Sequence, residues 1–366
     1  MKTTLYKILL VFALSPAIAF CDNGFGKEFS GRHTKEKKVS KKFNVSPKAL
    51  LSIDNSYGNV YISTWDQNVV SIEVFIKTNG NDEEKVKQKL DEIRIEFNQT
   101  GNGVSAETHF SRDDQSFWSG LFGNNSNVNM EVNYVIKAPV TNNVDISNDY
   151  GSIFIDKLRG NAQISCDYGR IDIGELHGAN NVISFDYSRN SHFGFINKAV
   201  ISADYSDFIV DEANAIELRA DYTNSHFKKV EALNFNCDYG SLKVDKLKRI
   251  VGSGDYLSTR IGQLFQSADL NLDYGNLEID KVIEGAGDIE ISTDYAGIKI
   301  GYAKSHPFRF TVNTSYGNVN GLDNLQVTRK NQSNTEKSFS GYNLKESASG
   351  NIRINSNYAG ITFNQK

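Results

Sequence analysis

Cysteine and proline are scarce in this chain of 366 residues, which has 3 Cys and 4 Pro. So few cysteines exclude a small secreted fold held together by disulfides. Familiar catalytic signatures are also missing. There is no Gly-x-Ser-x-Gly, P-loop or His-Glu-x-x-His motif, and the six His lack the spacing of metal ligands. The sequence therefore predicts a protein that is not an enzyme, with no catalytic residues and no cofactor.

Long apolar runs are absent after the first residues, so no transmembrane helix is predicted. The N-terminal stretch MKTTLYKILLVFALSPAIAF has a positively charged start and a short apolar core at 8–16, followed by a small-residue cleavage site at 17–19. It predicts a signal peptide over residues 1–19. We expect export to the periplasm, the outer-membrane surface or the medium. Cys21 offers lipidation as an alternative, although Phe20 is bulky for the residue before a lipidated cysteine.

Basic residues are slightly fewer than acidic ones, with 40 Lys and Arg against 44 Asp and Glu, so the net charge is −4. A mildly acidic chain is a poor binder of nucleic acid. Residues 20–44 are a local exception, because Lys27 to Phe43 holds seven Lys or Arg and two Glu. We interpret this segment as a solvated basic leader or linker. The alternative is peripheral contact with an anionic membrane or envelope polymer.

A short motif, Asp-Tyr usually followed by a small residue, recurs along the chain, as in ISCDYGRIDIGEL and FNCDYGSLKVDKL. Its tyrosines are 17 to 21 residues apart, at positions 150, 168, 187, 205, 222, 239, 256, 274, 295 and 316. Tyr57 and Tyr358 are outlying copies. A fixed period of this length is typical of stacked units that fold only against their neighbours.

Apolar residues alternate within each unit, as Ile216, Leu218 and Ala220 do, which is the signature of β-strands. Tight two-residue turns between long strands are missing, so a hairpin array is disfavoured. A coil that stacks about 4.8 Å above the previous one fits better. The sequence predicts an all-β fold, a right-handed parallel β-helix of about 18 residues per rung, over residues 141–366.

Residues 45–140 differ from the repeats and predict an N-terminal β-rich cap with one helix near 82–95, where Val86, Leu90 and Ile93 share a helical face. Within this cap, residues 116–125 form an aromatic, Gly/Asn-rich loop. The loop either folds over the end of the rod or exposes an aromatic tip to a partner or membrane, through Phe117, Trp118, Leu121 and Phe122. The Asn/Ser-rich stretch near 323–350 predicts a loop inserted before the last rung.

Stacked coils turn sequence repeats into columns, and one column is acidic. The residue before Tyr is an outward-facing acid in nine units: Asp149, Asp167, Asp186, Asp204, Asp221, Asp238, Asp255, Asp273 and Asp294. We expect each Asp to cap its corner by accepting backbone N–H groups beyond it, as an Asx turn. The middle of the column, Asp167 to Asp273, is a possible binding surface. Calcium at Asp204, Asp221, Asp238 and Asp255 is an alternative, although one acid per rung is a thin ligand set.

Three further columns follow from the same register. Small polar residues, mostly Ser and Asn, lie two positions before each Asp and predict a flat hydrogen-bonding ladder. The tyrosines share the parity of the core, so we expect their rings to fill a corner of the interior with the hydroxyl reaching out. If the corner turns them outward, a row of rings beside acids would suit carbohydrate. Cys166 and Cys237 share an inward column and are too far apart for a disulfide, so we expect buried free thiols.

The segments LLSIDNSYGNVYIST and VNYVIKAPVTNNVDISNDYGSIFIDKL resemble the bacterial putative-adhesin domain family of unknown function. The resemblance includes the lead-in Val135 to Pro139 and the Gly-x-Ile-x-Ile pattern at Gly151 to Ile155 and Gly169 to Ile173. It covers the chain from about residue 45 to its end. It implies an exported β-helix and brings no catalytic residues. The Asp-Tyr pair is stronger here than the family pattern implies.

Together these features predict an exported envelope or surface β-helix, adhesin-like and non-catalytic, that displays a binding surface to a glycan, a surface or a protein. An envelope-stress or regulatory partner protein is the first alternative. A β-helix polysaccharide lyase or hydrolase is the second, but a glycosidase needs two carboxylates in different environments, whereas a column gives each acid a similar one.

Overall fold

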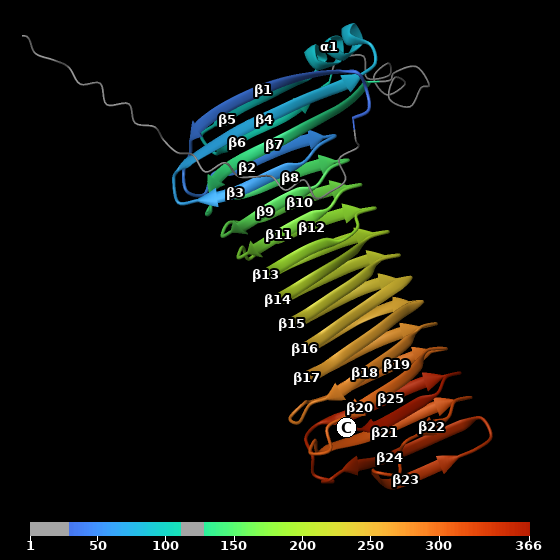
Figure 1. Cartoon of the computed structure of the whole chain (residues 1–366). Coiled ribbons are helices and arrows are strands. Elements are labelled where there is room, and N and C mark those ends of the chain that lie inside the picture. The colour runs from blue at the N-terminus through green and yellow to red at the C-terminus, as the bar shows by residue number, and fades with distance from the viewer. Residues whose placement is uncertain (1–28, 111–127) are drawn as a thin grey trace, which may run out of the picture.

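The computed structural model describes residues 29–110 and 128–366, and it is a β-rod topped by an antiparallel cap (Figure 1). Its 26 strands form one continuous sheet, and α1 (Glu83–Glu92) is the only helix of the described residues. No described helix has the length and apolar character needed to cross a membrane. The predicted signal peptide and the aromatic loop with Phe117, Trp118, Leu121 and Phe122 lie outside the described residues.

The cap is built on antiparallel pairing. Strand β4 (Val69–Gly80) lies between β1 (His33–Asn44) and β7 (Val128–Pro139), and β5 (Arg94–Thr100) pairs with β6 (Gly103–His109). Helix α1 begins after Asp82, whose carboxylate accepts the N–H groups of Glu84 and Lys85. The helix packs Val86 and Leu90 inward, within the range where the sequence predicts it.

The prediction of a solvated leader is wrong for the described end of that segment, because residues 33–44 form strand β1. Phe43 is buried and lies 6.1 Å from Phe97 between ring centroids, and Val39 is half-buried. Strand β1 is an edge strand of the cap and carries five lysines. Charged side chains on an edge discourage pairing with other chains.

Below the cap, each strand pairs in parallel with the equivalent strand one coil away. The coils begin with β2 (Leu50–Ser56) and β3 (Val60–Trp65), inside the region predicted as cap, which stack on β8 (Asn143–Asp149) and β9 (Ile153–Leu158). Paired residues such as Asp204 and Asp221 are 17 positions apart, so sequence repeats become columns. The following strands are β10 (Ala162–Asp167), β11 (Ile171–Leu176), β12 (Asn181–Asp186), β13 (Ser191–Asp204), β14 (Asp207–Asp221), β15 (Asn224–Asp238), β16 (Gly240–Asp255), β17 (Leu257–Asp273), β18 (Asn276–Val282), β19 (Ile289–Asp294) and β20 (Gly297–Tyr302).

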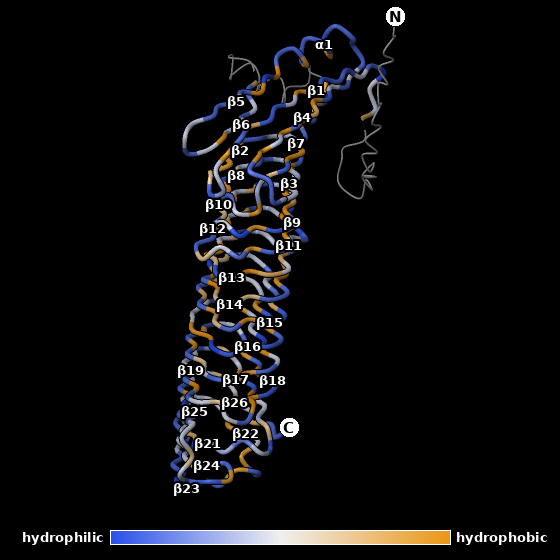
Figure 2. The backbone as a smooth tube through the Cα atoms, turned by 90° about the vertical axis from the view of Figure 1, so that its left-hand side faces the viewer, coloured by the Kyte–Doolittle hydropathy of each residue, from blue (hydrophilic) through white to orange (hydrophobic). Residues whose placement is uncertain are grey.

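Hydropathy alternates along every coil, as Figure 2 shows by its interleaved blue and orange segments. The apolar residues point inward and form one continuous core along the rod. The architecture is therefore a β-solenoid, in which each coil buries its apolar face only by stacking on its neighbours.

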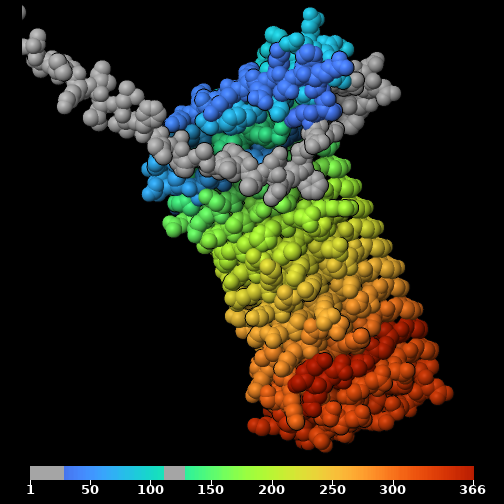
Figure 3. Space-filling view, in the orientation of Figure 1, coloured from blue at the N-terminus to red at the C-terminus, as the bar shows by residue number. Residues whose placement is uncertain are grey.

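The last coils do not stack in chain order. Strands β25 (Asn351–Asn357) and β26 (Ile361–Gln365) lie between the coil of β19 and β20 and the coil of β21 (Phe308–Ser315) and β22 (Val319–Asn320). Figure 3 shows these C-terminal residues as a red band between orange coils. The prediction of an inserted loop near 323–350 is wrong, because this stretch holds β23 (Gln326–Gln332) and β24 (Glu336–Asn343). They pair antiparallel with each other, and β24 also pairs with β21, closing the end of the rod.

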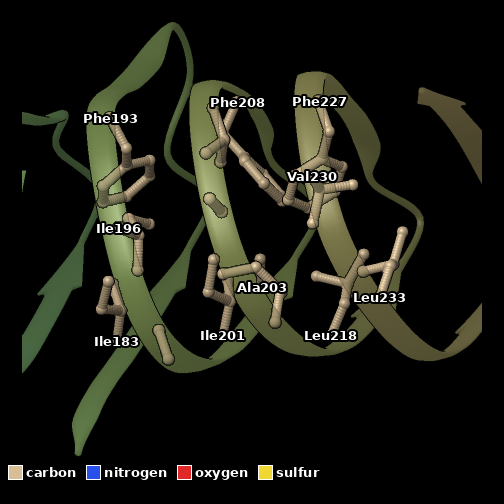
Figure 4. Packing of buried hydrophobic residues seen from close by; sticks show 14 of the residues in the cluster. Ile183, Phe193, Ile196, Ile201, Ala203, Phe208, Leu218, Phe227, Val230 and Leu233 are labelled. Atoms are coloured by element: carbon tan, nitrogen blue, oxygen red, sulfur yellow. The ribbon is translucent and has the colours of Figure 1, made fainter. Parts of the chain in front are cut away.

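Interlocking phenylalanine rings stabilise the core of the middle coils. Phe193, Phe208 and Phe227 lie in consecutive coils and point into the rod (Figure 4). Phe193 and Phe227 are in register with Val210 between them, and Phe208 lies two positions earlier in its own coil. Phe208 meets its two neighbours edge to face, a favourable geometry for aromatic rings. Cys166 and Cys237 are buried free thiols, as predicted, and burial raises the pKa of each to about 12.

Candidate functional site: a tyrosine–aspartate face

A ladder of stacked tyrosines runs along one corner of the rod. Neighbouring ring centroids are 4.6 to 5.2 Å apart, and the ring planes agree within 12°. In spatial order the ladder contains Tyr57, Tyr150, Tyr168, Tyr187, Tyr205, Tyr222, Tyr239, Tyr256, Tyr274, Tyr295, Tyr358 and Tyr316. Tyr358 lies between Tyr295 and Tyr316 because its coil is inserted there. The ladder thus continues through the rearranged end of the rod.

The prediction that the rings fill the interior is wrong. Eleven of the twelve tyrosines are exposed, from 43% at Tyr150 to 62% at Tyr316, and Tyr57 is half-buried under Phe110. Every ladder tyrosine has a positive φ, between 51° and 64°. This left-handed conformation breaks the in-out alternation of the strand. The ring therefore turns outward, and the next residue, such as Thr223, turns in and is buried.

The residue that follows Tyr is small at most of these corners. In the middle coils Ser188, Ser206 and Thr223 fill this position, and their hydroxyls accept N–H groups from the preceding coil and donate to its carbonyl oxygens. At Gly240 a Cβ atom would lie 2.1 Å from the carbonyl oxygen of Thr223. The position after Tyr is therefore filled by Gly, Ser, Thr or Ala at every corner of the ladder except that of Leu257, which is buried there.

The acidic column lies beside the ladder, with the register that the sequence predicts. Its hydrogen bonds differ from the expected Asx turn. In six steps the Oδ1 atom of one Asp accepts the backbone N–H of the Asp in the next coil, at 2.8 to 3.2 Å: Asp167 to Asp186, Asp186 to Asp204, Asp204 to Asp221, Asp221 to Asp238, Asp238 to Asp255 and Asp273 to Asp294. Each carboxylate therefore links two coils instead of capping its own corner.

The column carries unneutralised negative charge. Within residues 29–110 and 128–366, none of its nine carboxylates takes part in an ion pair, whereas acids elsewhere on the same coils do, as Asp211 does with Lys228. Burial, and after it the neighbouring carboxylates, raises the pKa of Asp149 and of Asp255. The described part of the chain contains no group of three or more His, Cys, Asp or Glu arranged to hold a metal ion.

A third column, of small polar residues, completes what we call the tyrosine–aspartate face. Ser165, Ser184 and Ser202 are in register there, and the column ends at Asn355 and Asn313, which are hydrogen-bonded at 3.1 Å. At this end of the face the hairpin of β23 and β24 borders an open pocket of about 270 Å³ lined by polar residues. Its lining includes Asn313, Ser315, Asn331, Glu336, Asn355 and Asn357.

The three columns offer a regular row of hydrogen-bonding groups to a ligand. The faces of the rings are covered by neighbouring rings, so a ligand meets ring edges and phenol hydroxyls. Among the described residues, no protein group is hydrogen-bonded to the hydroxyl of any of the eleven exposed tyrosines. Carboxylate oxygens and amide or hydroxyl side chains lie beside them. The sequence pattern located all three columns but not the outward turn of the rings.

Comparison with known proteins gives similarity only at the level of solved structures. No family model matches the chain, and no curated protein matches it. A putative adhesin from Parabacteroides distasonis is 13% identical, with 74% of this chain and 94% of that chain covered and a TM-score of 0.36. A putative adhesin from Parabacteroides merdae is 9% identical, with 72% and 95% covered and a TM-score of 0.36.

A putative cell adhesion protein from Clostridium sporogenes is 12% identical, with 91% of this chain and 100% of that chain covered and a TM-score of 0.20. These structures are described as putative adhesins or a putative cell adhesion protein, the same kind of protein that the sequence resembles.

Proposed function

We propose that the protein is an exported, adhesin-like scaffold of the cell envelope or surface that binds an extended glycan along the tyrosine–aspartate face. Export rests on the N-terminal signal sequence. In this proposal the rod is a right-handed parallel β-helix that acts as a rigid support. The observation that carries the proposal is the row of eleven exposed tyrosines in the left-handed conformation.

The energetics of the ladder favour a binding role over a purely structural one. A non-glycine residue in the left-handed region costs about 1–2 kcal/mol, whereas Gly or Asn adopts it readily. Stacking of one aromatic pair returns about 0.5–1.5 kcal/mol. The two terms nearly cancel, so stability alone does not explain tyrosine at every corner. Strained residues that persist in this way are typical of functional sites.

The chemistry of the face favours a ligand with many hydrogen-bond donors. The carboxylates of Asp186, Asp204 and Asp221 are acceptors without cationic partners, and the Tyr hydroxyls beside them can donate or accept. Sugar hydroxyl and amino groups supply such donors at short intervals. A polyanionic glycan would be repelled by the column. The polar pocket at the C-terminal end of the face would hold one end of the bound glycan.

Binding without catalysis is part of the proposal. The six linked carboxylates of the column share one hydrogen-bonding pattern, whereas acid–base cleavage of a glycan needs two carboxyl groups with different environments. Release of sugar products from a bound glycan would contradict this part directly.

A labelled-glycan binding assay tests the proposal on the mature chain. The probes are oligosaccharides of six β-linked glucose units, six β-linked glucosamine units and six galacturonate units. We expect the neutral and the cationic probes to bind and the galacturonate probe to stay unbound. Replacing Tyr205, Tyr222 and Tyr239 by Asn should weaken binding at least about tenfold, because Asn keeps the left-handed backbone and removes the rings.

The matched control replaces Ile209 and Phe265 by Asn, since both are exposed apolar residues outside the face. This variant should bind like the unmodified chain. Absence of binding by all three probes, or equal binding by both variants, would overturn the proposed site.

A further inference from the structure

The C-terminal segment 351–366 occupies a slot between two coils that precede it in the chain. Strand β25 pairs with β19 on one side and with β21 on the other, and β26 pairs with β20 and β22. Within the described residues, no strand pairing joins β21 to β19 or β22 to β20. The unit of residues 308–343 is therefore attached to the rod through this segment.

The slot recognises the segment through core packing, backbone pairing and side-chain contacts. Ile352, Ile354, Ile361 and Phe363 are buried in the rod. The hydroxyl of Thr293 bonds that of Ser356 at 3.0 Å, and Asn357 donates to Asp294 at 2.7 Å. Arg353 forms an ion pair with Glu290. Ladder stacking adds to this, since Tyr358 lies 4.6 Å from Tyr295 and 5.0 Å from Tyr316.

The strands on both sides of the slot precede the segment in the chain. Residues 308–343 are synthesised and exported before residues 351–366, yet the later segment lies inside. Without this segment, β19 and β21 would each lack the parallel partner that β25 supplies on these edges. Such edges accept any strand of matching pattern. Residues 351–366 of a second copy have the same side chains and would make the same contacts in the slot.

The link from β24 to β25 is suited to exchange between copies. Residues 344–350 must pass around the start of β21, because β24 and β25 lie on opposite sides of that strand. Leu344 in this link is 58% exposed and has a φ of 65°. Short links under strain favour strand exchange, in which the segment leaves its own chain and fills the slot of another.

We propose that residues 351–366 are an exchangeable strand pair, and that the slot between the coil of residues 289–302 and the coil of residues 308–320 binds the same segment of a second copy. Reciprocal exchange joins two rods at their C-terminal ends. The dimer then presents two tyrosine–aspartate faces, although the exchange itself does not depend on what those faces bind. Two linked faces raise the avidity for a repetitive surface.

A disulfide between two different chains tests the exchange. One mature chain carries Ser292→Cys and the other Asn355→Cys, since these residues are paired between β19 and β25. Both chains also carry Cys21→Ser and different tags, and they are refolded together. An interchain disulfide at this pair requires that β25 of one chain lies beside β19 of the other, and paired strands have the separation that a disulfide needs.

We expect an interchain product whose share rises about tenfold for each tenfold rise in protein concentration while closure within one chain dominates. The matched control is a Ser253→Cys chain refolded with an Asn271→Cys chain. These residues are also paired, but between β16 and β17, whose coils are consecutive, so this pair should stay uncrosslinked.

A single chain with both Ser292→Cys and Asn355→Cys checks folding and geometry, because it should close an intrachain disulfide at low protein concentration. If that chain closes and no interchain product forms at any concentration, the segment fills only its own slot and the proposal is wrong. Equal interchain product from the control pair would show unspecific crosslinking and would also overturn it.

Discussion

His306 is buried in the connection between β20 and β21, where its ring lies 5.3 Å from that of Phe308 between centroids. Neither ring nitrogen has a hydrogen-bond partner among the described residues. Burial lowers the pKa of this imidazole, and Glu284 opposes the shift. The residue is therefore neutral in the folded state, and its protonation would place an unpaired charge in the core.

This burial predicts a loss of stability in acid. The pKa is lower in the folded than in the unfolded state, so the stabilising contribution is complete above the unfolded value of about 6.5 and is lost as the pH falls below it. We expect at most about 1.4 kcal/mol of lost unfolding free energy per pH unit from this residue. His306→Phe should remove that part of the pH dependence, measured by thermal unfolding between pH 7.5 and 5. The exposed His177→Gln should keep it. A His306→Phe profile identical to that of the unmodified chain would contradict the prediction.

The corner that carries the ladder is an element with two competing requirements. Its backbone needs a left-handed residue, and stacking needs a ring at the same position. Tyr222 illustrates both, with a φ of 53° and centroids of its neighbours Tyr205 and Tyr239 each 4.8 Å away. The residue after it, Thr223, is buried and links the coils through its hydroxyl.

Substitution at one corner separates the two requirements. Tyr222→Ala loses the ring and keeps the strained backbone, whereas Tyr222→Gly loses the ring and relieves the strain. We expect the Gly variant to be more stable than the Ala variant by about 1 kcal/mol, the reverse of their order within a regular strand. Urea unfolding of the two variants measures the difference. An Ala variant at least as stable as the Gly variant would show that the left-handed backbone is not retained.

Across the whole molecule, the acidic column is a line of like charges with no opposite charges beside it. Two carboxylates 4.8 Å apart repel by about 0.9 kcal/mol in water, and the repulsion is screened over about 10 Å at 0.1 M salt. The hydrogen bonds between coils hold this line in place despite the repulsion. A cationic or donor-rich ligand that binds along the column would reduce this repulsion.

Neutralising alternate acids should therefore stabilise the rod. The variant with Asp204→Asn, Asp238→Asn and Asp273→Asn keeps the acceptor oxygen for the next coil and removes three charges. We expect it to be more stable by about 1–3 kcal/mol in dilute buffer, with the gain shrinking as salt is added. Thermal unfolding across a salt series measures this.

The control for this variant replaces Asp211, Asp245 and Asp280 by Asn, which removes the same charge from acids that have ion-pair partners. It should be no more stable than the unmodified chain. If both triple variants respond alike to salt, the column is not a special line of repulsion.

The columns of this protein follow from the spacing of its repeats. In-register stacking places residues one repeat apart directly above each other, so the rows of Asp, Ser or Asn, and Tyr can be read from spacing alone. The inward cysteines follow from the same register. Alternation of apolar residues likewise predicts the strands and the core, because side chains of a strand alternate between its two faces.

The direction of the tyrosine rings and the place of the last coil depend instead on long-range packing. The alternation of the strand predicts that Tyr222 faces inward. The sign of φ at a corner, however, depends on how the whole coil closes, and the spacing of residues does not reveal it. The place of residues 351–366 between two earlier coils is likewise a matter of which edges remain unpaired when the segment arrives. The edge strand formed by residues 33–44 and the hairpin within 323–350 depend on partners distant in the chain, whose contribution local composition does not reveal.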